Sequence, residues 1–345
     1  MTTVAIIGSE QSGRTSLASK LGKKGNVSDI AMYEFSKSGK VLTAIDVLGY
    51  PKSIKPLLTA LNLSDMAILC VSPKGLDAYA GECIVALDIL DYKHGLIVLT
   101  KSDTSYSYAL DELKNKIKKI TAGTALEKWE YISISTTSFE GMEELKEMIF
   151  AIGERVDEEN VELNNLPPRV IIDQCFNVTG IGCVALGVLS QGTIHTKDKM
   201  NVYPINKPVE IRSIQLHDVD AKNAPAGSRV GLALKNIQSK EIERGFIVSD
   251  KEIISIDITL NCVLSKFTKG FSVGDVLHIF VGLQSAPGRV ENIIANGENV
   301  KHAGPSKECT VRFSGSKEIA YSISDRFVLA SLDEKQRFVG YGFPE

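Results

Sequence analysis

The chain has 345 residues, of which 43% are hydrophobic and 23% charged, and its formal net charge is −3. This length predicts two or three domains, and the composition is typical of a soluble globular protein. The slight negative charge excludes a general attraction to nucleic acid, so any RNA contact must come from a local patch. No apolar stretch reaches the ~20 residues that a membrane span needs, and no signal peptide precedes the first predicted strand, so we expect a cytoplasmic protein.

The cysteines favour a reducing compartment. The six of them form no C-x-x-C pair, and most stand inside apolar runs. Buried free thiols are therefore expected ahead of zinc ligands or disulfides.

The first part of the chain alternates short apolar runs with segments of helical periodicity. This alternation predicts a mostly parallel sheet covered on both faces, in an α/β domain over residues 1–156. The predicted strands are 2–8, 30–36, 40–46, 66–72, 95–101 and 129–135. The predicted helices are 14–22, 80–91, 108–120 and 141–156.

The second part of the chain has a different texture. Residues 157–168 are acidic and polar and end in two prolines, which predicts a linker. From Arg169 onward, short runs rich in Val, Ile and Phe are separated by turn residues, which is typical of all-β barrels. We expect one β-barrel domain over 169–250 and another over 251–345.

The sequence GSEQSGRTS, which directly follows an apolar run, has the glycine spacing of a phosphate-binding loop. Gly8 ends a predicted strand and Gly13 opens a predicted helix, so backbone N–H groups and the helix N-terminus can face phosphates. Thr15 supplies the hydroxyl expected to hold Mg²⁺. The alternative is a tight strand–helix turn without a ligand. The predicted nucleotide-binding residues here are Gly8, Ser9, Glu10, Gln11, Ser12, Gly13, Arg14, Thr15 and Ser16.

Arg14 stands where this kind of loop usually has a lysine. A guanidinium is larger and planar, with its donors fixed in a fork, so the exchange is not conservative. It can hold phosphate bidentately with altered geometry, or lie as a solvated arginine on the helix surface.

Three further stretches follow predicted strands in the order that a GTPase requires. Asp46 and Gly49 form D-x-x-G, in which the carboxylate would reach Mg²⁺ through water and the Gly49 N–H would contact a third phosphate. In the stretch LTKSD, Lys101 would cover a guanine base and Asp103 would accept its hydrogen bonds. The remaining predicted nucleotide contacts are Thr100, Ser135 and Thr136. Four such motifs at strand ends predict a P-loop GTPase domain.

The whole chain resembles the translational GTPases around elongation factor Tu, and among them the SelB proteins. Residues 180–192, GIGCVALGVLSQG, and the following strand with Arg212 and His217 carry the best match. The resemblance implies GTP or GDP with Mg²⁺ as cofactors, aminoacyl-tRNA and the ribosome as partners, and a monomer. It also implies that Phe176, Arg212 and His217 line a tRNA pocket, although ordinary barrel packing explains these residues equally well.

The chain departs from that family where hydrolysis is concerned. Thr100 replaces the asparagine of the base-reading motif, and Tyr50 and Cys83 stand where the family has histidines. Only KKGNVSD separates the first helix from the second strand, whereas the family has a long switch segment whose threonine completes the Mg²⁺ shell. Ser28 is the only hydroxyl there. Because hydrolysis depends on positioning water, we expect slow or absent turnover and weakened nucleotide binding, and no catalytic residue is assigned.

Two hypotheses follow. The first is a GTP-binding, SelB-like elongation factor that delivers a specialised aminoacyl-tRNA. The alternative is a pseudo-GTPase module that holds RNA or a ribosomal partner without nucleotide-driven switching. SelB proteins carry an additional C-terminal domain beyond the part that this chain resembles, so direct reading of an mRNA signal is not expected.

Overall fold

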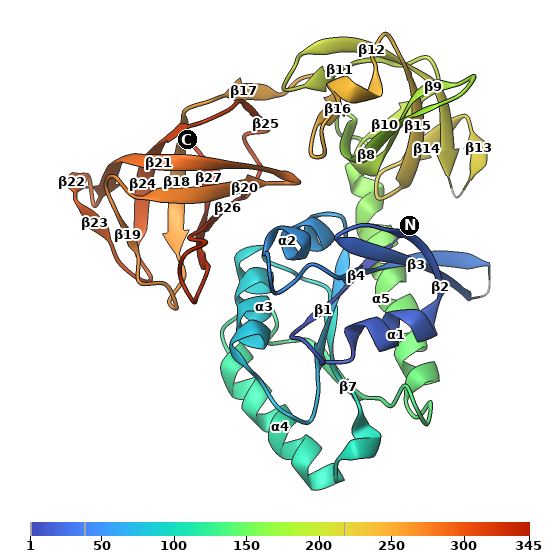
Figure 1. Ribbon diagram of the computed structural model, residues 1–345, viewed down its shortest axis with the longest axis vertical. Helices are drawn as coiled ribbons and strands as arrows, with labels where there is room; N and C mark the ends of the chain where they lie inside the picture. Colours follow the sequence, from blue (N-terminus) through green and yellow to red (C-terminus); the bar gives the residue numbers. More distant parts are fainter. Residues whose placement is uncertain (1, 38, 217) are drawn as a thin grey trace. The chain divides into compact units, whose positions relative to one another are not determined.

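The computed structural model describes residues 2–37, 39–216 and 218–345 and divides into two compact units, which meet in sequence between Glu158 and Glu159 (Figure 1). No helix in the described part of the chain is long and apolar enough to cross a membrane.

The first unit is built on a seven-stranded sheet of order β2-β3-β4-β1-β5-β6-β7. Strands β4, β1, β5, β6 and β7 are parallel, while β2 and β3 extend one edge antiparallel. The strands are β1 (Thr3–Gly8), β2 (Lys23–Val27), β3 (Ile30–Lys37), β4 (Lys40–Val47), β5 (Met66–Val71), β6 (Gly95–Leu99) and β7 (Glu130–Ser133). The predicted α/β fold is confirmed.

Helices cover both faces of this sheet. Val4 and Ile6 of β1 belong to a core cluster with α1 and α5, while Ala5 and Ile7 point to the other face, because strand side chains alternate. The helices are α1 (Arg14–Leu21), α2 (Lys55–Asn62), α3 (Ala78–Ile89), α4 (Ser107–Thr121) and α5 (Met142–Leu163). α2 is an addition to the sequence-based prediction.

Two segments differ from their sequence-based description. Residues 23–27, which lie in the short connection between the first helix and the second strand, form the edge strand β2, with Lys23 opposite Glu34 of β3. Helix α5 continues to Leu163, into the stretch 157–168 for which the sequence predicts a linker. Its residues there are mostly good helix formers, and the helix ends shortly before Pro167, which cannot continue it.

The second unit contains two six-stranded β-barrels, as predicted. In the first barrel β11-β16-β8-β9-β15-β12 is closed by pairing of β11 with β12, and in the second β20-β26-β27-β18-β24-β21 is closed by pairing of β20 with β21. The first barrel has β8 (Arg169–Val178), β9 (Gly182–Gln191), β10 (Thr193–His195), β11 (Lys199–Tyr203), β12 (Lys207–Leu216), β13 (Val219–Ala221), β14 (Asn223–Pro225), β15 (Arg229–Lys235) and β16 (Ile247–Ser249). The second has β17 (Ile253–Ser255), β18 (Ile258–Leu264), β19 (Phe271–Ser272), β20 (Val276–Val281), β21 (Gln284–Ala295), β22 (Glu298–Val300), β23 (His302–Ala303), β24 (Glu308–Gly315), β25 (Ile319–Tyr321), β26 (Phe327–Ala330) and β27 (Phe338–Pro344).

Arg169, at the start of β8, joins the two barrels. Its Nε donates to Glu252 Oε1 at 2.8 Å, and its Nη2 donates to Asp325 Oδ2 at 2.6 Å. The Arg169 side chain is only 11% exposed and the Glu252 side chain 2%, so this is a largely buried network. The proposed domain border near Asp250 falls between β16 and β17.

Candidate nucleotide site

The loop between β1 and α1 has the backbone shape of a ligand cradle. Gly8, Gln11 and Gly13 all have positive φ angles, of 146°, 60° and 92°. A Cβ atom at Gly8 would lie 2.5 Å from the Cys70 carbonyl oxygen, so only glycine fits there. The loop therefore brings the backbone back sharply from the strand into the helix.

The start of α1 leaves its backbone donors available. Gly13 is the N-cap, no side chain caps the helix, and the first turn has no acidic residue. Within the described part of the chain, the buried oxygen atoms Ser12 Oγ and Asp46 Oδ1 have no hydrogen-bond partner. This arrangement fits a phosphate with its cation. The helix N–H groups can donate to the phosphate oxygens, and the buried protein oxygens can find their missing partners in the phosphate and the cation.

Thr15 and Asp46 form the candidate Mg²⁺ position. The Thr15 hydroxyl donates to Asp46 Oδ2 at 2.7 Å, which joins the first turn of α1 to the end of β4. Burial raises the pKa of the Asp46 carboxyl, while the Thr15 hydrogen bond and the charge of Arg14 act against this rise. A hydroxyl and a carboxylate are hard oxygen ligands of the kind that Mg²⁺ prefers.

Arg14 occupies neither of the two positions that the sequence suggested. Its Nη1 donates to the Val47 carbonyl at 2.9 Å and its Nη2 to the Tyr50 carbonyl at 3.3 Å. The guanidinium carbon also lies 5.8 Å from the centre of the Tyr50 ring. The residue is 9% exposed, so it is not a solvated surface arginine, and its guanidinium faces the segment after β4.

The segment after β4 is held at two further points. The Gly49 N–H, which the sequence assigns to a third phosphate, donates to the Asp29 carbonyl at 2.9 Å. The Tyr50 hydroxyl lies 2.7 Å from the Tyr79 carbonyl oxygen and 2.9 Å from Glu82 Oε2, both on α3. Burial raises the pKa of the Tyr50 hydroxyl well above its ordinary value, so this group stays neutral.

Cys83 lies beside this contact, in the position where the resemblance expects a histidine. It is fully buried, and burial raises the pKa of its thiol to about 12. A neutral buried thiol cannot orient or activate water as an imidazole does.

The base-reading motif is tied to the phosphate loop. The Thr100 hydroxyl donates to the Ser12 carbonyl at 2.5 Å, and Lys101 Nζ donates to the Gln11 carbonyl at 2.7 Å. Asp103 is exposed in a short 3-10 helix, Ser102–Thr104. The stretch LTKSD and the phosphate loop therefore form one continuous edge of the sheet.

Ser135 and Thr136 follow β7 at the same edge. The Ser135 N–H donates to the Glu140 carbonyl, and its hydroxyl accepts from the N–H groups of Thr137 and Ser138. Ser135 thus builds the turn, while Thr136 is half-buried beside it.

Two of the three residues predicted for a tRNA pocket, Phe176 and Arg212, belong to the first barrel. Phe176, on β8, is 42% exposed. Arg212, on β12, is exposed and donates to the Ile181 carbonyl at 3.1 Å. His217 lies outside the described residues.

Sequence reasoning missed Asp29 and Glu82. The position of Glu82 was readable in principle, because a carboxyl in the apolar run ECIVAL of a covered helix must find a buried polar partner. The Asp29 contact is made by a backbone carbonyl, for which no side-chain pattern exists.

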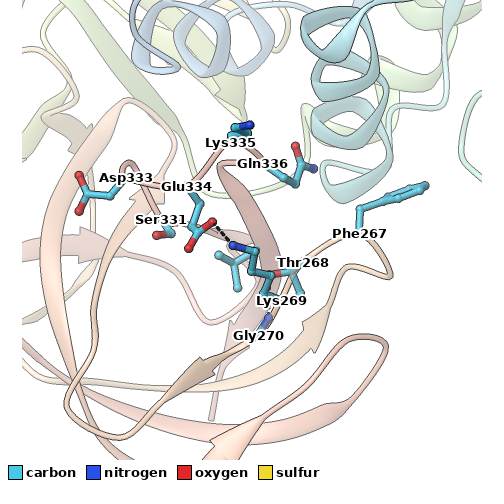
Figure 2. Close-up of a pocket in the computed structure, with 10 residues that line it drawn as sticks. Phe267, Thr268, Lys269, Gly270, Ser331, Asp333, Glu334, Lys335 and Gln336 are labelled. Atoms are coloured by element: carbon cyan, nitrogen blue, oxygen red, sulfur yellow. Dashed lines mark hydrogen bonds and ion pairs between the residues drawn. The ribbon is translucent and has the colours of Figure 1, made fainter.

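A cavity of about 430 Å³ lies in the second barrel, and none of the residues that line it is a predicted site residue. Figure 2 shows Lys269 and Glu334 meeting there, joined by an ion pair of 2.8 Å. Lys335 and Asp333 add one further charge of each sign. The cavity therefore has no excess of charge that would select a nucleotide.

Known proteins resemble this chain in sequence and fold. Residues 182–249 match the family elongation factor Tu domain 2. An uncharacterised protein of Methanocaldococcus jannaschii is 33% identical over 329 residues, which cover 94% of each chain. A selenocysteine-specific elongation factor of the same organism is 25% identical, covering 98% of this chain and 78% of its own length. Translation elongation factor SelB from Methanococcus maripaludis, solved in complex with the GTP analogue GppNHp, superposes with a TM-score of 0.85 at 24% identity, covering 100% of this chain and 78% of its own.

A P-loop α/β domain followed by two β-barrels, with these motifs at the strand ends, defines a translational GTPase of the elongation factor type. Within that class, the chain belongs to the SelB-like family related to elongation factor Tu.

Proposed function

We propose that this protein is a SelB-like translation factor that binds GTP and GDP with Mg²⁺, hydrolyses GTP slowly, and carries a specialised aminoacyl-tRNA to the ribosome. The observation that carries the proposal is the joining of separate strand ends at one edge of the sheet. The Thr15–Asp46 and Thr100–Ser12 hydrogen bonds connect the loop after β1 with the ends of β4 and β6. Ligands of open α/β sheets bind at such carboxyl ends.

Different residues bind the phosphates, the Mg²⁺ ion and the guanine base. The N–H groups of residues 9–15 bind the phosphates, and Thr15 and Asp46 hold the Mg²⁺, which neutralises phosphate charge. Lys101 covers the guanine and Asp103 accepts its ring donors. Calorimetry with GDP and GTP, with and without Mg²⁺, tests this assignment: we expect heat of binding that Mg²⁺ strengthens, and a flat titration would contradict it.

Slow hydrolysis follows from the surroundings of Tyr50. Its hydroxyl is neutral and lies against Glu82 and Tyr79, so it does not orient an attacking water. Losing a positioned catalytic group commonly costs factors of about 10²–10⁴ in rate. We expect single-turnover GTP cleavage far below that of the selenocysteine-specific factor from Methanocaldococcus jannaschii measured in parallel, with ribosomes present.

Carriage of tRNA is proposed from the family and from the exposed Phe176 and Arg212. Binding should weaken steeply with salt, because phosphate contacts release counterions. A panel of tRNAs charged with ordinary amino acids, selenocysteine or pyrrolysine identifies the acyl group. Equal affinity for charged and uncharged tRNA would contradict the proposal.

The second candidate function is a binding module without nucleotide-driven switching. It is favoured by one observation: the Gly49 N–H donates to the Asp29 carbonyl, whereas a switching factor would need it for the third phosphate. The two candidates differ in linkage: a switching factor binds tRNA differently with GTP and GDP, whereas equal tRNA affinities with both nucleotides indicate the module.

A further inference from the structure

The segment Val47–Tyr50 is held from three directions. Arg14 donates to the carbonyls at both of its ends, Val47 and Tyr50. The Gly49 N–H donates to Asp29, which directly precedes β3. The Tyr50 ring packs edge-on against Tyr79, with 6.2 Å between the ring centres, and its hydroxyl contacts Glu82. The segment is thus attached to α1, to the start of β3 and to α3 at once.

Arg14 is the one of these attachments that also belongs to the phosphate loop. A lysine there has a single ammonium, whereas the arginine fork donates to two carbonyls that are three residues apart. For the guanidinium to turn toward a phosphate, both of these buried hydrogen bonds would have to break, which is unfavourable. The side chain is therefore better satisfied where it lies.

Space around the segment is equally restricted. A Cβ atom at Gly49 would lie 2.7 Å from Cγ of Pro56 in α2, so the backbone there is packed against the next helix. A movement of the Gly49 N–H toward a phosphate would have to break its bond to Asp29 and carry the Tyr50 ring out of contact with α3.

We propose that Arg14 is a positioning residue that fixes Val47–Tyr50 in one arrangement, with or without nucleotide. The site then takes a guanosine diphosphate moiety and gains no affinity from a third phosphate, which corresponds to the candidate function without nucleotide-driven switching. The second half of this proposal rests on the proposed nucleotide binding; the first half does not.

Hydrogen exchange on the nucleotide-free full chain tests the first half. The variants are Arg14→Lys, which keeps the charge but removes the fork, and Tyr50→Phe, which removes the hydroxyl contact with α3. Arg155→Lys on the exposed side of α5 is the matched control. We expect exchange of the Gly49 amide to rise about tenfold or more in Arg14→Lys and to stay unchanged in the control. Equal exchange in Arg14→Lys and the control would overturn the role of Arg14.

If Arg14→Lys does not fold, which circular dichroism would reveal, Tyr50→Phe still tests whether its contacts hold Val47–Tyr50 in one arrangement. We then expect faster exchange over residues 47–50 with α1 still protected, because the α3 attachment alone is lost. If residues 47–50 exchange in Tyr50→Phe as slowly as in the wild type, the contacts of Tyr50 with α3 do not fix the segment.

Affinity measurements test the second half. We expect the wild type to bind GDP and GTP with dissociation constants within about threefold of each other, and with the same Gly49 exchange. GTP binding about tenfold or more tighter than GDP, with new protection at Gly49, would overturn the proposal. If no variant binds either nucleotide, the proposed function fails, while the exchange result still decides the role of Arg14.

Discussion

Arg14 shows how one side chain can change what a phosphate loop does without changing its backbone. The glycines and the helix start keep the positive φ angles and the open N–H groups of the motif. The cation, however, serves the carbonyls of Val47 and Tyr50. The sequence could predict the loop, because glycine spacing and strand–helix context are local properties. It could not predict the direction of the arginine, because that depends on a segment more than thirty residues away.

The buried carboxyl of Asp46 should make the stability of the folded protein depend on pH. Burial raises the pKa of its carboxyl in the folded protein, so the folded state holds this proton more readily than the unfolded state. Its contribution to stability is therefore greatest at low pH and is lost as the pH rises through the folded pKa. Urea unfolding of the nucleotide-free wild type and Asp46→Asn should show the wild type gaining stability relative to the variant as the pH falls from about 7 to 4. A constant or opposite difference would contradict this.

Thr15 provides a test of the metal position. Removing its hydroxyl in Thr15→Ala should lower GDP affinity about tenfold in Mg²⁺ and leave affinity in EDTA nearly unchanged, because the lost ligand belongs to the metal. Ser19→Ala, one helical turn further and exposed, is the control. A loss of the same size with and without Mg²⁺ would instead place Thr15 on the nucleotide itself.

At the scale of elements, the sequence predicts the apolar strands of the α/β domain, whereas it does not predict strand β2 or helix α2. β1 and β5 are buried along their whole length and apolar except for Thr3, which is typical of central parallel strands. β2 contains KKGNV, whose polar residues lack the strand pattern, and it forms because β3 offers an unpaired edge. The helix α2 begins beside Pro56, whose fixed φ suits a first helical turn, but its apolar run was too short to separate from a loop.

The end of α5 gives the element-scale prediction. Asn164 Oδ1 accepts from the N–H of the buried Ala226 at 2.8 Å, at the start of the turn after β14. Asn164→Ala removes this acceptor and should lower the free energy of unfolding by roughly 1–3 kcal/mol, because a buried N–H loses its partner. Asn165→Ala, at the exposed neighbouring position, should change it by less than about 0.5 kcal/mol. Circular dichroism during urea unfolding measures both, and equal effects would argue against the contact.

At the scale of the whole molecule, the barrels depend on a network that the sequence did not indicate. The sequence identifies Arg169 only as the start of the β region. An arginine in a strand does not indicate which carboxylates it will contact. Glu252 precedes β17 and Asp325 follows β25, and the pairing of these two strands brings the carboxylates together. The number and type of barrels were predictable from short strands and turns, whereas the contacts between barrels were not.

Arg169→Met is the corresponding prediction. It leaves two carboxylates with side-chain exposures of 2% and 17% without their cation, and should destabilise the protein by about 3–5 kcal/mol. Arg312→Met breaks a pair of 3.8 Å whose side chains are 64% and 55% exposed, and should cost less than about 1 kcal/mol. Calorimetric unfolding compares them; a loss at Arg169 no larger than at Arg312 would show that the buried network contributes little.

Helix α5 is divided between the two compact units, with most of its turns in the first and its last residues in the second. One uninterrupted series of backbone hydrogen bonds therefore crosses the boundary. Fraying of the last turn therefore shortens a helix whose earlier residues pack on the α/β sheet, so disorder that begins after Glu158 should spread toward that packed part of the helix.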